Sequence, residues 1–209
     1  VMVSGSRHRL SATRLDPSGI GDHTFNSDGT VTITGSSLST GKDAIAIDTE
    51  DRVILATSSH DTGSDHGVGQ VRRFTSAGKQ DPGFGTSGLV TLPKLPHIQA
   101  VETDRADRVL IAGYSSHGFD LARLSTAGDL DPTFADDGRA TVDFGEGKGA
   151  RAYALTTDFL GHHIIAAGTS RGGAWGSLAV AKFNTDGTPD TTFGDRGRAF
   201  QRDGGGFHV

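Results

Sequence analysis

The fold is decided by a phrase that reads Leu121-Ala-Arg-Leu-Ser-Thr-Ala-Gly-Asp-Leu-Asp-Pro-Thr-Phe134 and that recurs along the chain. In each copy, a glycine lies six residues before a phenylalanine and a second glycine lies four residues after it. The four copies occupy residues 14–29, 73–88, 123–138 and 182–197. Successive phenylalanines are 59, 50 and 59 positions apart, so insertions fall between the copies and never inside them, as is usual for loops.

A second phrase, two apolar segments joined by polar residues, alternates with the first. It occurs at residues 43–56, 98–113 and 150–168, and a shortened version opens the chain at residues 1–5. Each full copy predicts two strands, and short segments around the first phrase, such as residues 89–92, add two more. Four-stranded units that repeat every 50 to 59 residues are typical of propeller blades. We therefore expect an all-β fold, a β-propeller built of four-stranded antiparallel blades, with about four blades in this chain.

Composition and charge support this fold class and exclude others. The chain has 209 residues, of which 31 are glycine, and only 7% are aromatic, which predicts many turns between short strands rather than long helices. No stretch approaches 18 apolar residues, so we expect no membrane span. A net charge of -5 argues against a nucleic-acid partner, because phosphate neutralisation needs a basic face. The absence of cysteine excludes disulfides and thiol chemistry.

We expect residues 1–209 to form a single β-propeller domain or half-propeller. Its blades are predicted at about residues 1–34, 43–92, 98–143 and 150–200. The glycines of the first phrase are expected in turns that require positive φ. The fixed spacing predicts that four phenylalanines fill equivalent buried sites between blades: Phe25, Phe84, Phe134 and Phe193.

The quoted phrase, preceded by Asp107-Arg-Val-Leu-Ile-Ala-Gly113, resembles the delta-60 repeat of bacterial, often exported, proteins. The segment Ala181-Lys-Phe-Asn-Thr-Asp-Gly-Thr-Pro-Asp-Thr-Thr-Phe-Gly194 matches equally well, and the resemblance covers essentially the whole chain. It implies a propeller-like β fold and a place in a secreted or cell-surface protein. It implies no catalytic residues, because the recurring positions look like turn and core positions.

Among the polar residues, only histidine is unusually abundant, with nine in the chain. Three histidines and one arginine follow the second strand of their blades and are expected on one face: His8, His60, His117 and Arg171. The segment His60-Asp-Thr-Gly-Ser-Asp-His66 is the densest cluster. Candidate ligand-binding residues are therefore His8, His60, Asp61, Asp65, His66, His117 and Arg171. Imidazole and carboxylate are zinc ligands, so His60, Asp65 and His66 are candidates for a divalent metal site, with solvated loop residues as the alternative.

These observations lead to several hypotheses about function. The first is a non-enzymatic β-propeller that serves as a binding or scaffold module, with a ligand surface formed by loops on one face and no required cofactor. The second is a hydrolase or lyase with a His/Asp site at the channel mouth, possible with or without a metal, although the chain lacks a Gly-x-Ser-x-Gly or His-Glu-x-x-His motif. The third is a carbohydrate-binding propeller, for which one Trp and two Tyr offer few stacking surfaces.

The last expectation concerns closure of the ring. The first blade has strands for its second, third and fourth positions but none for its first. Since unpaired strand edges are sticky, we expect self-association, with two copies forming an eight-bladed toroid. The alternatives are that residues 206–209 pair with residues 1–6 to close a four-bladed ring, or that the missing strand belongs to other polypeptide.

Overall fold

The computed structural model describes residues 2–6, 8–35, 38–39, 44–59, 67–145, 149–170, 177–201 and 207–208. These residues form strands and turns, and none of them builds a helix that is long and apolar enough to cross a membrane. The strands make four antiparallel sheets, which follow one another in chain order and are called the first to the fourth blade below. The all-β, propeller-like prediction is confirmed.

The four blades contain the following strands. The first blade has the order β1 (Met2–Ser6), β2 (Arg9–Thr13) and β3 (Thr30–Thr34). In the second, β4 (Leu38–Ser39) and β5 (Ile45–Ile47) both pair with β6 (Val53–Ser59), which is followed by β7 (Val68–Phe74) and β8 (Leu89–Leu92). The third has β9 (His97–Thr103), β10 (Val109–Ser115), β11 (Gly118–Leu124) and β12 (Arg139–Val142). The fourth has β13 (Arg151–Thr157), β14 (His163–Ser170), β15 (Ser177–Asn184), β16 (Arg198–Gln201) and β17 (Phe207–His208).

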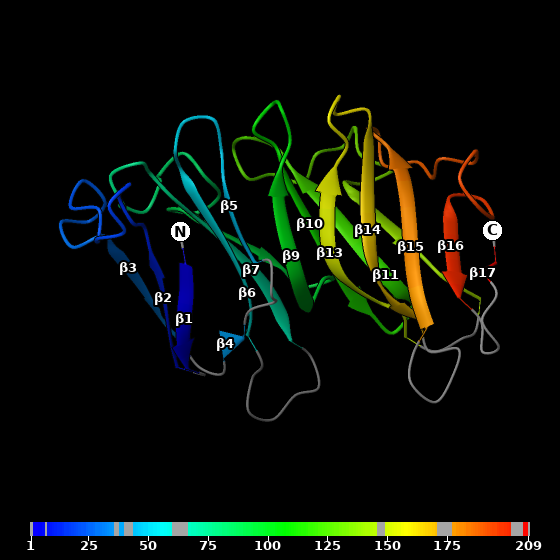
Figure 1. The fold of residues 1–209 in the computed structure, drawn as a ribbon, viewed down its shortest axis with the longest axis horizontal. Coiled ribbons are helices and arrows are strands. Elements are labelled where there is room, and N and C mark those ends of the chain that lie inside the picture. The colour runs from blue at the N-terminus through cyan, green and yellow to red at the C-terminus, as the bar shows by residue number, and fades with distance from the viewer. Residues whose placement is uncertain are drawn as a thin grey trace.

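The blades lie in a row, with the first blade at one end and β16 and β17 at the other, so β1 and β17 are far apart (Figure 1). The innermost strands β5, β9 and β13 contact one another in turn, as the inner strands of a propeller do. The tail strand β17 pairs with β16, and β1 pairs with β2. The alternative in which the tail pairs with the first residues of the chain is therefore wrong for this structure, because the tail extends its own blade instead.

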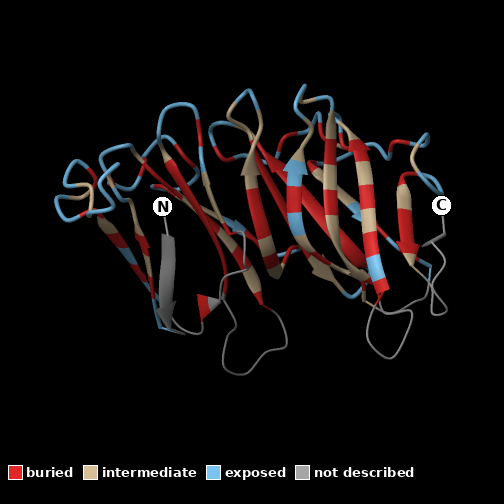
Figure 2. Ribbon diagram, viewed as in Figure 1, coloured by how far each residue is buried: buried red, intermediate tan, exposed pale blue. Residues whose placement is uncertain are grey.

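The hydrophobic core lies between the blades, in three clusters that each join two neighbours. Strand β10 shows how one blade serves two clusters. Val109 and Ile111 pack toward the second blade, whereas Leu110 and Ala112 pack toward the fourth, because successive side chains of a strand point to opposite faces. Buried residues accordingly fill the central strands, and exposed residues gather in the turns (Figure 2).

Three of the four repeated phenylalanines occupy the predicted sites. Phe25, Phe84 and Phe134 are each 0% exposed. Each ring packs against the glycine turn of the following blade, so that a Cβ added to Gly78 would lie 3.2 Å from Phe25. The prediction is wrong for Phe193, which is only half-buried, because no described residues of a following blade cover it.

Replacing Phe134 by alanine is expected to lower the free energy of unfolding by ~3–5 kcal/mol, since a fully buried ring would leave a cavity between the third and fourth blades. Urea unfolding followed by circular dichroism measures the change. Phe159→Ala is the control, because that ring is 89% exposed and its loss should change stability by less than about 0.5 kcal/mol. Equal losses in the two variants would contradict the assignment.

Candidate functional site

The sequence predicts a ligand surface at the turns between the second and third strands of the blades, and of its residues the structure describes His8 and His117. The repeated phrases contact each other from blade to blade, as when the Asn26 N–H donates to Ala77 O at 3.0 Å, so they share one face. Since the strands are antiparallel, the β1–β2 and β10–β11 turns emerge on the opposite face. His8 and His117 stand in these two turns, and both side chains are exposed.

The remaining candidate ligands lie outside the described residues: His60, Asp61, Asp65, His66 and Arg171. The same holds for the whole proposed metal set of His60, Asp65 and His66. Within the described residues, no three His, Asp or Glu side chains come together in a way that suits a metal ion. The seven-residue candidate set therefore stays a prediction.

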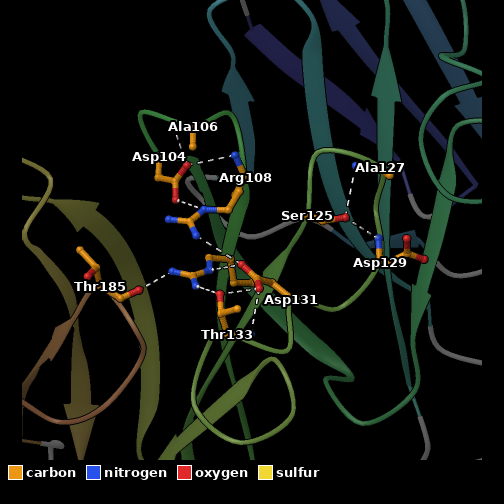
Figure 3. A network of polar contacts seen from close by, with 10 residues as sticks. Asp104, Ala106, Arg108, Ser125, Ala127, Asp129, Asp131, Thr133 and Thr185 are labelled. Atoms are coloured by element: carbon orange, nitrogen blue, oxygen red, sulfur yellow. Dashed lines mark hydrogen bonds and ion pairs between the residues drawn. The ribbon is translucent and has the colours of Figure 1, made fainter.

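The phrase face carries a polar network that repeats from blade to blade, shown for the third blade in Figure 3. Within each of the first three phrases an arginine pairs with the aspartate eight residues later, and in the third the Arg123 Nε to Asp131 Oδ2 distance is 2.8 Å. The guanidinium of Arg123 also lies over the Phe134 ring, 4.8 Å from its centroid. Arg, Asp and Phe thus form one packed unit.

This unit reaches the next blade through three contacts. Arg73 Nη1 donates to Thr126 O at 2.7 Å, and Arg123 Nη1 donates to Thr185 O. The N–H of the residue after each of Phe25, Phe84 and Phe134 donates to the carbonyl before the next glycine, at 2.5 Å from Ala135 to Asp186. The phenylalanine ring covers that glycine. We call the phenylalanine and the following N–H the plug, and the glycine turn that receives them the socket.

Charges in the network stay ionised although they are removed from water. Burial acts to raise the pKa of the Asp131 carboxyl, but hydrogen bonds from Thr133 and the Arg123 charge outweigh it and hold that pKa below its usual value. Burial, with Arg108 nearby, lowers the pKa of the Arg123 guanidinium. A carboxylate kept charged by donors on every side is suited to holding a turn in place rather than to exchanging protons.

The turns between the first two strands add a second tier of ion pairs on the same face. Arg108 pairs with Asp104 at 2.7 Å and also lies 3.4 Å from Asp131, so the turn and the phrase of the third blade are joined. Between the second and third blades, Thr49 donates to Asp107 from both its N–H and its hydroxyl. These contacts tie neighbouring turns together.

In the fourth blade, a histidine replaces the turn arginine. His163 Nδ1 lies 2.7 Å from Asp158 Oδ2, and its Nε2 lies 3.6 Å from Asp190 Oδ2. Lys182 also pairs with Asp190, at 2.8 Å, and its hydrogen bond is the main cause of the lowered pKa of Asp190. Both ring nitrogens of His163 face carboxylates, so neither is placed to take a proton from a serine or a water, as a hydrolase base must.

A pocket of about 180 Å³ lies between the third and fourth blades on this face. Arg105, Arg108 and Arg123 line it, and Gly161 stands where the preceding boundary has Asp107. The arginines are already engaged, however, since Arg105 donates to Phe159 O and the other two pair with aspartates. The charges of Arg108 and Arg123 are thus compensated by aspartates, whereas the hydrogen bond of Arg105 goes to a neutral carbonyl.

The structural role of the phrase arginine was not predicted from the sequence, although the sequence contains a signal for it. A basic residue and an aspartate recur at a constant spacing of eight residues in all four phrases, with lysine in the last: Arg14 and Asp22, Arg73 and Asp81, Arg123 and Asp131, Lys182 and Asp190. The spacing points to an ion pair across the turn.

Four antiparallel sheets joined by a repeated inter-blade contact define a β-propeller-like repeat protein. A family model described as "Domain of unknown function (DUF5122) beta-propeller" matches residues 107–134 and 163–193. These segments contain the two phrases that carry the resemblance to the delta-60 repeat, and the match supports the predicted propeller-like repeat family. A search of curated proteins found no match to the chain.

Replacing Asp131 by asparagine is expected to lower the free energy of unfolding by ~3–5 kcal/mol, because the Arg123 guanidinium, 2% exposed, would lose its buried counter-charge. Chemical denaturation measures the loss. The control is Asp195→Asn, since the Asp195 side chain is 52% exposed in its pair with Arg198 and should contribute less than about 1 kcal/mol. A neutral result for Asp131 would show that the network is not structural.

Asp158 should titrate at an unusually low pH. Its hydrogen bond with His163 is the main cause that lowers the pKa of this carboxyl from 3.8 to about 2. The stabilisation is therefore present above the ordinary pKa and is lost as the pH falls through about 2. Carboxyl ¹³C NMR should show the pKa rising toward 3.8 in His163→Ala. It should stay low in His162→Ala, because His162 donates to Asp158 through its backbone N–H.

Proposed function

We propose that the protein is a non-enzymatic propeller-like module that binds a ligand or acts as a scaffold. One observation carries the proposal: the connections on the phrase face have nearly constant length, whereas those between the second and third strands vary. Only residues 116–117 separate β10 from β11, but residues 60–67 separate β6 from β7 and residues 171–176 separate β14 from β15. Connections of variable length on a fixed scaffold are characteristic of a ligand surface.

The use of charge on the phrase face also supports a non-catalytic role. Its aspartates accept hydrogen bonds inside turns, as Asp131 and Asp190 do from Thr133 and Thr192. Its arginines hold neighbouring blades together. Side chains that are committed to structure in this way are poor candidates for a hydrolase or lyase. The proposed ligand surface is therefore the opposite face, with His8, His117 and the segments 60–66 and 171–176.

The test compares the parent chain with a variant whose segments 60–66 and 171–176 are replaced by Gly-Ser sequences of equal length. Both chains are applied to a glycan array and a peptide library, and incubated with model esters, phosphate esters and glycosides. We expect binding by the parent only, melting temperatures within about 2 °C of each other, and no turnover by either chain. Turnover lost with the two segments would support the enzyme hypothesis instead, and binding retained by the variant would place the ligand elsewhere.

The proposal has three further parts. A divalent metal at His60, Asp65 and His66 would raise the melting temperature in zinc relative to chelator, and His60→Ala would abolish that rise. The resemblance to exported repeat proteins supports a secreted or cell-surface location, which immunodetection in culture supernatant and surface fractions tests.

Finally, we propose that the chain associates with itself through its two end blades.

A further inference from the structure

The two end blades carry the two unmatched halves of the contact that joins all the internal blades. Three boundaries inside the chain combine a plug and a socket: Phe25 with Gly78, Phe84 with Gly128, and Phe134 with Gly187. The fourth plug, Phe193, is half-buried. The first socket, Gly19, would have nothing within 4 Å of an added Cβ. One complete contact is thus divided between the ends of the row.

The face of the fourth blade that carries the plug has apolar residues at positions that are buried in the other blades. Leu178, four residues before Lys182, is 47% exposed. The residues at the same distance from the phrase arginine are Leu10 in the first blade and Phe119 in the third, and these are 5% and 0% exposed. Val180 is half-buried, whereas its counterpart Leu121 is 1% exposed. This face therefore has the composition of an internal blade boundary.

The socket side of the first blade shows the complementary pattern. Leu15, the residue after Arg14, is 37% exposed. Its counterparts in the later blades face a preceding blade, and Phe74, Leu124 and Phe183 are 5%, 0% and 1% exposed. The turn at Gly19 has φ +84, close to the +82 of Gly187, so the socket has its conformation without a plug in place.

We propose that the fourth blade of one copy docks on the first blade of a second copy through this contact. Phe193 then covers Gly19, the Gly194 N–H donates to Ser18 O, and Leu178 and Leu15 are buried. The occupant is a second copy because, at all three internal boundaries, the ring and the following N–H contact the glycine turn of a unit with the same repeated phrase. The inference identifies the residues that would form the self-association proposed above, and it does not depend on ligand binding.

A head-to-tail contact generates either a closed ring or an open fibre, depending on the rotation between copies. Two copies supply eight blades, and closed propellers of four to eight blades are known. The inner strands already contact one another in turn, which gives the row its propeller-like arrangement. We propose the closed pair, in which both plugs and both sockets are filled, because eight blades fall within the range of closed propellers.

The experiment measures the mass of the 209-residue chain by light scattering at 50 μM. The parent should have about twice 21.7 kDa. Phe193→Ser removes the plug, and Gly19→Asn places a Cβ where a ring lies in the other boundaries, while asparagine tolerates the positive φ. Each variant should weaken the pair at least tenfold. A mixture of the two should regain part of the doubled mass, because the plug of the Gly19→Asn variant fits the socket of the Phe193→Ser variant and restores one of the two contacts.

Matched controls separate docking from folding. Gly145→Asn has the same φ of +84 and the same open surroundings but lies away from the socket, and Phe159→Ser removes an exposed ring elsewhere. Both should keep the doubled mass. Gly128→Asn should lower the melting temperature sharply, since its Cβ would meet Phe84 inside the chain. A parent mass near 21.7 kDa, or a pair that survives both interface variants, would overturn the inference without affecting the ligand proposal.

Discussion

A phenylalanine ring that covers a glycine turn is the contact on which the rest of this structure depends. The ring needs a neighbour without a side chain, because a Cβ on Gly187 would lie 2.8 Å from Phe134. Positive φ and close approach therefore fall on the same residue, and glycine meets both demands. Spacing within the phrase is rigid for this reason, since a one-residue shift would move either the ring or the turn out of register.

The arginine beside the ring solves a second problem, which is how to satisfy backbone carbonyls where two blades meet. Turn carbonyls such as Thr126 O would otherwise lose water at the boundary without a donor. Arginine supplies several donors on one planar group, which lets Arg73 bind Asp81 and the neighbouring turn together while it covers Phe84. The aspartate is then required, because a guanidinium that is 3% exposed needs a counter-charge.

The sequence predicted the strands and the buried phenylalanines because both produce regular spacing. It did not predict that the Arg123 side chain is buried and contacts the next blade, since a basic residue at the end of a strand is compatible with solvent exposure. Phe193 shows a further limit, because the phrase around it is intact and only its neighbours in space decide its burial. The candidate ligand residues carry no repeated signal, so the sequence predicts the face on which His8 and His117 lie but not what they contact.

Because each unit presents a plug on one side and a socket on the other, any unit is compatible with a copy of itself. Duplicating the coding segment for one blade therefore adds a neighbour that fits without a new interface having to arise by mutation. The same property makes substitutions in the contact costly in one copy and tolerable only when both partners change together. Sequence divergence is thereby directed to the connecting segments, where a change in length or charge leaves the contact between blades unchanged.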